Sequence, residues 1–352
     1  MAERSLQLPS MRLWPQWPLR LLWGLTLGLA LGGAAAAAEP SAIEAQSRAL
    51  QRASAAVVGL RAQAVEDARS AATLGRVRQG SGVVIGNGDL VLTIGYLILE
   101  AEQVQLITDD EREVPARLVG YDVATGFGLV QPLAPLHIEP ASLGAGAALA
   151  RGEALMIVSG GEDGVVSAAQ LISRRGFSGY WEYHVDGALF TAPPRADHSG
   201  AGLFNGRGEL VGIGSLLLKD AADPGAPPLT GNMFVPIDLL VPILPELRSR
   251  GSSGASRRAW LGVNCVETEG SVRVVRVIRD SPAEVAGVEP GDRIVRIDGT
   301  EVHALDVLWK TLWAGGAAER ESRLDIVRDG AARTLKVQSV DRMKTLRSAR
   351  GI

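Results

Sequence analysis

The sequence is poor in the residues that support disulfide or metal chemistry. It contains one cysteine, Cys265, among 352 residues, which excludes an internal disulfide bond and any cysteine-based metal site. We expect Cys265 to be a small buried apolar residue, because free cysteine is one of the most often buried residue types. Histidine is also scarce, with four in the chain. No histidine or carboxylate cluster has the spacing of a zinc or calcium site, so no metal and no cofactor is predicted.

The chain also lacks a surplus of charge of either sign. It has 36 Lys and Arg against 39 Asp and Glu, for a net charge of -3. Proteins that bind nucleic acid concentrate positive charge on one face, so nucleic acid is excluded as a partner. Hydrophobic residues make up 46% of the sequence, which is ordinary globular composition at a length that suits about two domains.

A long apolar run occurs only near the N-terminus. Arg12 and Arg20 precede the apolar residues 21–31, and a run of alanines ends at Ala38. This order is typical of a Sec-type signal peptide with cleavage near Ala38. A membrane anchor is the alternative, but the run is shorter than the roughly 20 residues that a span needs. We therefore predict that residues 1–38 are a signal peptide and that the protein is exported to the periplasm.

The middle of the chain is rich in short apolar segments bounded by glycine. Runs of this length and spacing predict an all-β barrel or sandwich. A short helix is expected before them over residues 41–54, and a closing helix after them over residues 238–247, despite two prolines. The apolar segments are residues 82–85, 90–93, 104–107, 116–119, 128–130, 154–158, 210–214 and 233–237.

A polar segment rich in glycine and serine, residues 248–257, follows this region and predicts a flexible linker. It divides the mature chain into a domain over residues 39–247 and a smaller one over residues 258–343. Apolar periodicity in the smaller domain predicts a helix over residues 303–312. Three strands are predicted there as well, over residues 272–278, 292–297 and 322–327.

The larger domain contains several motifs in a fixed order. They are Gly80–Ile85, Leu92-Thr93, Leu118–Asp122, Ser199-Gly200, Gly208–Ile213 and Phe234–Ile237. Their order and spacing over residues 80–245 resemble the HtrA (Deg) family of exported trypsin-like serine proteases. The resemblance implies a chymotrypsin-like double β-barrel.

The smaller domain contains a second set of motifs: Leu261-Gly262-Val263, Ser281–Ile294, Asp298-Gly299 and Arg328-Asp329-Gly330. These motifs resemble the PDZ domain that follows the protease domain in this family. In a PDZ domain, backbone N–H groups of a loop bind a C-terminal carboxylate, and the peptide adds as a strand between a strand and a helix.

The resemblance also implies the residues that would bind peptide. They are the loop residues Leu261, Gly262 and Val263, with Leu305 and Leu308 on the facing helix. These apolar side chains fill a domain core in the alternative interpretation, and for Leu261 both interpretations hold together. Trp309 either packs within its helix or lies at the rim of the groove.

The catalytic positions implied by the family are largely replaced. Ser199, in the loop Asp197–Leu203, stands at the nucleophile position, but the histidine position falls on Tyr96 and the aspartate position on Gly126. A serine hydroxyl is a weak nucleophile without an adjacent base. Tyr96 cannot be that base near neutral pH, because tyrosine has a pKa of about 10 and no neutral nitrogen. Asp197 replaces an oxyanion-hole glycine, and its carboxylate would oppose the developing negative charge.

Two other residues are candidates for a substitute base at Ser199. His198 adjoins the serine, but neighbours in a tight loop usually point apart. Lys219 would give a serine–lysine pair, but it follows an apolar run as a strand-end charge. We therefore interpret Ser199 as a structural remnant of a catalytic site.

The sequence thus predicts a catalytically inactive HtrA-like protein that binds unfolded proteins or C-terminal peptide segments of exported proteins, in a quality-control or adaptor role. One alternative is an active serine endopeptidase with an unrecognised base. Another is a structural subunit docked to an active protease relative. Oligomerisation is possible, but family trimers use aromatic residues near the start of the protease domain, and none occurs between Ala38 and Tyr96.

Overall fold

The computed structural model describes residues 39–347. The predicted signal peptide over residues 1–38 lies outside the described residues. Helix α1 (Glu39–Ala55) corresponds to the first predicted helix. Within residues 39–347, every helix is too short or too polar to cross a membrane.

The first barrel is a closed sheet of six antiparallel strands in the order β1-β2-β3-β6-β5-β4. Its inward-facing valines, leucines and isoleucines are buried, and β3 is buried along its whole length. The bounds are β1 (Val57–Ala64), β2 (Val77–Ile85), β3 (Leu90–Ile94), β4 (Ala101–Ile107), β5 (Glu113–Tyr121) and β6 (Phe127–Pro132), with the one-turn helices α2 (Ala71–Leu74) and α3 (Gly95–Ile98).

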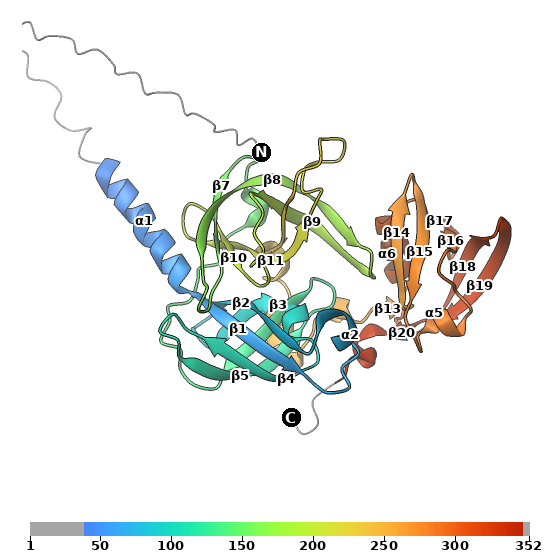
Figure 1. Cartoon of the computed structure of the whole chain (residues 1–352), viewed down its shortest axis with the longest axis horizontal. Helices are drawn as coiled ribbons and strands as arrows, with labels where there is room; N and C mark the ends of the chain where they lie inside the picture. Colours follow the sequence, from blue (N-terminus) through green and yellow to red (C-terminus); the bar gives the residue numbers. More distant parts are fainter. Residues whose placement is uncertain (1–38, 348–352) are drawn as a thin grey trace, which may run out of the picture. The chain divides into compact units, whose positions relative to one another are not determined.

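The second barrel closes in the order β10-β11-β12-β9-β8-β7. Figure 1 shows the first barrel in blue to teal and the second in green to yellow, so the predicted double β-barrel is confirmed. The bounds are β7 (Ala154–Val158), β8 (Val166–Gly179), β9 (Tyr183–Ala192), β10 (Gly202–Phe204), β11 (Leu210–Leu218) and β12 (Gly231–Pro236), with the 3-10 turn η1 (Gly146–Ala148).

The closing helix predicted over residues 238–247 is broken in two. A 3-10 turn, η2 (Ile237–Leu239), is followed by turns and then by helix α4 (Leu244–Arg250). Pro242 falls in the break, because it lacks the backbone N–H that a continuous helix would need there. Pro245 lies in the first turn of α4, where no such donor is required.

The predicted linker is anchored rather than free. The hydroxyls of Ser253 and Ser256 donate to the carboxylate of Asp122 in the first barrel, and Ser256 Oγ accepts from the N–H of Val123 at 2.9 Å. Both serines are buried, and Ser256 ends the 3-10 turn η3 (Gly254–Ser256). The composition predicted a mobile segment because serine and glycine are typical of solvated linkers. In the structure, the hydroxyls of Ser253 and Ser256 instead donate to the buried carboxylate of Asp122.

The second domain, predicted as a PDZ domain, has a six-stranded sheet that contains β14 to β19, and β13 pairs with β20 beside it. Its core, which includes Cys265, Leu308 and Trp309, consists of residues from this domain alone. The bounds are β13 (Ala259–Trp260), β14 (Val263–Thr268), β15 (Ser271–Val277), α5 (Pro282–Val285), β16 (Arg293–Ile297), β17 (Thr300–Glu301), α6 (Leu305–Ala314), β18 (Glu321–Arg328), β19 (Ala331–Gln338), β20 (Val340–Asp341) and η4 (Arg342–Thr345).

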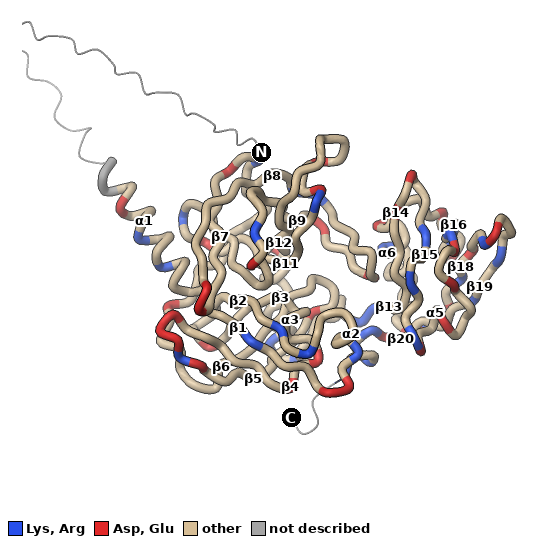
Figure 2. Tube along the Cα trace, in the orientation of Figure 1, with Lys and Arg blue, Asp and Glu red and all other residues tan. Residues whose placement is uncertain are grey.

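Basic and acidic residues are interspersed along the trace of both barrels and of the PDZ domain (Figure 2). Many of the arginines pair with a neighbouring carboxylate, as Arg328 does with Asp292 at 2.6 Å. This distribution agrees with the balanced composition of the sequence.

Candidate functional site

Ser199 lies in the loop between β9 and β10, and both barrels hold that loop. The N–H of Ser81, on β2 of the first barrel, donates to the carbonyl oxygen of Ser199 at 2.9 Å. The N–H of Gly200 donates to the carbonyl of Gly214, on β11 of the second barrel, also at 2.9 Å. The framework that carries a nucleophile in a two-barrel protease is therefore present around this serine.

Tyr96 extends from helix α3 to Ser199. Its hydroxyl lies 2.8 Å from Ser199 Oγ and 2.9 Å from the carbonyl oxygen of Ser215. Burial raises the pKa of Tyr96 to about 12, although the hydrogen bond with Ser199 acts in the opposite direction. The phenol therefore keeps its proton near neutral pH. A group that holds its own proton cannot remove that of Ser199, so the contact supplies a hydrogen-bond partner but no base.

Gly126 lies in the turn before β6 and offers no side chain to orient a base. Its carbonyl oxygen accepts from the N–H of Gly95, next to Tyr96, at 2.7 Å. Its φ of +85° is a conformation that residues with side chains rarely adopt, so an aspartate here would be strained. The nearby acid Asp122 does not replace it, because its carboxylate accepts from Thr125, Ser253 and Ser256. Burial raises the pKa of Asp122, but these hydrogen bonds outweigh it and lower the pKa.

Asp197 forms an ion pair beside the serine. The guanidinium of Arg195 donates to it from Nε at 2.8 Å and from Nη2 at 2.5 Å, and the Ser159 hydroxyl donates as well. Burial raises the pKa of Asp197, but the bonds from Arg195 and Ser159 lower it below its usual value. Asp197 is therefore a carboxylate at neutral pH. Sequence reasoning found Asp197 but not its partner Arg195, although the two are separated by one residue.

Among the described residues, neither substitute base forms a hydrogen bond with the Ser199 side chain. The hydrogen-bond partner of the His198 ring is the carbonyl oxygen of Arg195, 3.1 Å from Nδ1. Burial lowers the pKa of His198, so the ring is more often neutral than an exposed histidine. Lys219 is exposed just beyond the end of β11.

The PDZ loop holds a carboxylate from the other domain. The N–H groups of Leu261, Gly262 and Val263 donate to the side chain of Glu182, with N–O distances between 2.6 and 3.1 Å. Gly262 has a φ of +86°, and a Cβ there would lie 2.2 Å from the Cβ of Ser281, so the loop requires glycine. Successive N–H groups that converge in this way form an anion-binding concavity.

Glu182 was missed by sequence reasoning. It lies in the turn between β8 and β9, and about 80 residues separate it from the PDZ loop. Short-range patterns carry no information about a contact of this kind. The only available signal was a lone glutamate among aromatic residues, Tyr180, Trp181 and Tyr183.

The predicted groove residues on helix α6 are buried in the PDZ core. Leu308 is fully buried and Leu305 nearly so. Trp309 is also fully buried, and its indole N–H donates to the carbonyl oxygen of Gly179 on the β8–β9 hairpin at 3.2 Å. Trp309 therefore packs within the core and also contacts the β8–β9 hairpin.

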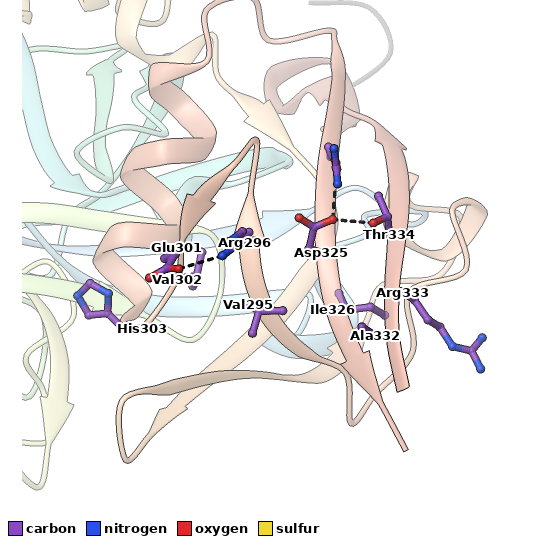
Figure 3. Close-up of a pocket in the computed structure, with 11 residues that line it drawn as sticks. Val295, Arg296, Glu301, Val302, His303, Asp325, Ile326, Ala332, Arg333 and Thr334 are labelled. Atoms are coloured by element: carbon purple, nitrogen blue, oxygen red, sulfur yellow. Dashed lines mark hydrogen bonds and ion pairs between the residues drawn. The ribbon is translucent and has the colours of Figure 1, made fainter. Parts of the chain in front are cut away.

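A separate hollow lies on the PDZ sheet (Figure 3) and contains none of the predicted site residues. Four of its charged side chains pair with one another. Arg296 pairs with Glu301 at 3.0 Å, and Asp325 accepts from Arg323 at 3.2 Å and from Thr334 at 2.7 Å. Within residues 39–347, no group of three or more His, Cys, Asp and Glu side chains could hold a metal ion.

Comparison with known proteins identifies both domains. Residues 80–213 match the trypsin-like peptidase domain family, and residues 259–338 match the PDZ domain family. A probable periplasmic serine endoprotease DegP-like from Hahella chejuensis is 28% identical over 239 residues, which cover 63% of this chain and 49% of the relative. A relative of the same description from Pseudomonas fulva is 27% identical over 273 residues, covering 73% and 55%. The chain spans about half the length of these curated relatives.

Solved structures share the fold. The HtrA-type protease AlgW with decapeptide has a TM-score of 0.53 at 20% identity, covering 86% of this chain and 99% of AlgW. The serine endoprotease from Yersinia pestis has a TM-score of 0.52 at 21% identity, covering 84% and 97%.

Proposed function

Because the chain belongs to the HtrA/Deg family, which joins a trypsin-like domain to a PDZ domain, we propose that it is a non-proteolytic member of that family. It binds unfolded chains or C-terminal segments of exported proteins. The observation that carries the proposal is the contact of Ser199 with Tyr96, a phenol whose pKa of about 12 keeps it protonated. Two further residues support the proposal. Gly126 supplies no acid to orient a base, and Asp197 brings negative charge to the loop of Ser199.

Peptide binding is assigned to the PDZ domain. Its loop keeps the N–H groups that recognise a carboxylate, and the sequence has no loss there comparable to that around Ser199. AlgW, which has the same fold, has been solved with a decapeptide and with a tripeptide. The proposed location is the periplasm, supported by the N-terminal sequence and by relatives described as periplasmic.

A fluorophosphonate probe and a casein assay test the absence of proteolysis. We expect the full chain to show no more labelling or cleavage than its Ser199→Ala variant, while an active trypsin-like protease in the same assay reacts readily. Labelling that Ser199→Ala abolishes would contradict the proposal and favour the active endopeptidase.

The same samples separate the third possibility. Casein cleavage that persists unchanged in Ser199→Ala would come from an active relative that copurifies with the chain, as expected for a docked structural subunit. Light scattering of a denatured test protein measures binding to unfolded chains. We expect the full chain to reduce aggregation, and no reduction would remove that part of the proposal.

A further inference from the structure

The turn of the β8–β9 hairpin, residues 179–182, pairs with the PDZ domain as a strand would. The N–H of Cys265, on β14, donates to the carbonyl oxygen of Tyr180 at 2.7 Å. Trp181 forms an antiparallel bridge with Asn264. We call residues 179–182 the hairpin tip. Backbone pairing with a sheet edge is the contact by which an extended peptide adds to a PDZ sheet.

Helix α6 contacts the same segment from its other side. The indole N–H of Trp309 donates to the carbonyl of Gly179 at 3.2 Å, and Lys310 lies 3.3 Å from Asp186 on β9. The hairpin tip thus has partners on both β14 and α6, the two elements that border a PDZ peptide groove.

Glu182 completes the likeness to a bound peptide. Its carboxylate accepts from the three N–H groups of the PDZ loop. Tyr180, whose carbonyl oxygen accepts from the N–H of Cys265, stands two residues before it. A C-terminal peptide would present its terminal carboxylate at the same donors. Here the side chain of an internal glutamate provides that carboxylate, and it is 3% exposed.

The chemistry of this contact is suited to exchange. The hydrogen bonds to Glu182 come from neutral backbone groups, and burial of the carboxylate raises its pKa despite these bonds and the positive charge of Arg342. Removing a carboxylate from water is costly, so the internal contact has only a limited advantage over a hydrated Glu182. A second carboxylate of the right shape could take its place.

We propose that the hairpin tip is an intramolecular ligand of the PDZ groove, with Glu182 in the place of a C-terminal carboxylate, and that external C-terminal peptides bind by displacing it. The second half of this inference rests on the proposed peptide-binding function, whereas the first half does not.

Hydrogen–deuterium exchange of the full chain tests occupancy without any peptide. In Glu182→Ala, we expect the amides of residues 261–263 to exchange at least about tenfold faster than in the wild type, because the carboxylate that accepts from them is lost. The matched control is Glu162→Ala, which changes an exposed glutamate in the turn before β8 and should leave these amides unchanged. Equal exchange in wild type and Glu182→Ala would overturn the inference.

Calorimetry with an apolar peptide that has a free C-terminus tests displacement, and its amidated twin is the control. We expect Glu182→Ala to bind the free peptide at least about tenfold more tightly than the wild type or Glu162→Ala, because the groove is no longer occupied for most of the time. The amidated peptide should bind Glu182→Ala only slightly more tightly than it binds the wild type.

The outcomes distinguish the two proposals. Equal tight binding by wild type and Glu182→Ala would overturn the displacement inference and leave the peptide-binding function intact. Faster exchange in Glu182→Ala with no binding of either peptide would establish the internal ligand and contradict the peptide-binding function.

Discussion

The trypsin-like domain and the PDZ domain each contain one of the protein's own carboxylates at the site proposed for that domain. In the first, Asp197 stands beside Ser199, and in the second, Glu182 lies in the PDZ loop. The partners differ. Asp197 is paired with the guanidinium of Arg195, which lowers its pKa against the effect of burial, whereas the hydrogen bonds to Glu182 come from neutral N–H groups and burial raises its pKa.

On the functions proposed above, this difference separates a lost site from a closed one. Around Ser199, Tyr96 and Gly126 stand at the positions that the family resemblance assigns to the catalytic histidine and aspartate. In the PDZ loop the N–H groups of Leu261, Gly262 and Val263 are present, and the proposed ligand is internal. We therefore expect that mutation is needed to reverse the first change and that a competing carboxylate is enough to reverse the second.

Repair of the catalytic site should give the largest effect. We expect Tyr96→His, Gly126→Asp and Asp197→Gly together to raise fluorophosphonate labelling of Ser199 by about 10³-fold, and each single repair to gain less than about tenfold, because triad members act as a unit. The φ of +85° at Gly126 limits the gain. Labelling kinetics measure it, with Ser199→Ala in the repaired background as the control. A large gain from Tyr96→His alone would show that the site had lost only its base.

The PDZ loop should be intolerant of a side chain at Gly262. A Cβ there would lie 2.2 Å from Ser281 Cβ at a φ of +86°, so we expect Gly262→Ala to lower the free energy of unfolding by about 3 kcal/mol. The control is Gly270→Ala, which has a φ of +68° and no atom within 4 Å of its Cβ and should cost about 1 kcal/mol. Urea denaturation compares them, and equal losses would mean that the loop is less rigid than described.

The PDZ domain alone should bind peptide better than the full chain. Its core contains only its own residues, and a fragment over residues 258–343 lacks the hairpin tip. We expect this fragment to bind a free apolar C-terminus more tightly than the full chain does, and amidation to weaken binding by about 1 to 3 kcal/mol, the scale of a charge-assisted hydrogen bond. Calorimetry measures both, and equal affinity for the two peptides would contradict carboxylate capture.

Loss of the carboxylate at Asp197 should have the smallest effect. Its side chain is 36% exposed, so we expect Asp197→Asn to cost less than about 1 kcal/mol at pH 7. Because its folded pKa is lowered, the carboxylate stabilises the fold above the unfolded pKa of about 3.9, and this contribution is lost as the pH falls through the folded value. Denaturation measured at neutral and at strongly acidic pH should show that the difference in stability between Asp197→Asn and the wild type shrinks as the pH falls.

The fold could be predicted from the sequence because glycine-bounded apolar runs and two sets of motifs carry it. The place of Tyr96 beside Ser199 also followed from the motif alignment, and the two hydroxyls do lie in contact. Short-range sequence patterns were less reliable at prolines, which can lie within a helix or end it, and at serines, which can be solvated or bind a buried group. Pro242 broke a predicted helix, and the serines of the linker found a buried acceptor in Asp122.

The internal ligand could not be predicted. Its contacts join residues far apart in sequence, and they are made by backbone N–H groups, which every residue except proline possesses. Leu305 and Leu308 lie on helix α6, in the region where a helix was predicted, and both are buried in the core. Periodicity does not distinguish a groove wall from a core, so their predicted role in binding peptide stays a prediction.

Because Ser253 and Ser256 are anchored at Asp122, an external peptide must compete with the hairpin tip for the PDZ groove at a high effective concentration of the tip. Only Arg257 and Arg258 stand between Ser256 and the start of β13 at Ala259, so the tether that links hairpin tip and groove is very short. A short tether gives an internal ligand an effective concentration on the order of millimolar. A dilute, solitary chain end competes poorly against that concentration, and a dense array of chain ends, as on an aggregate surface, competes well.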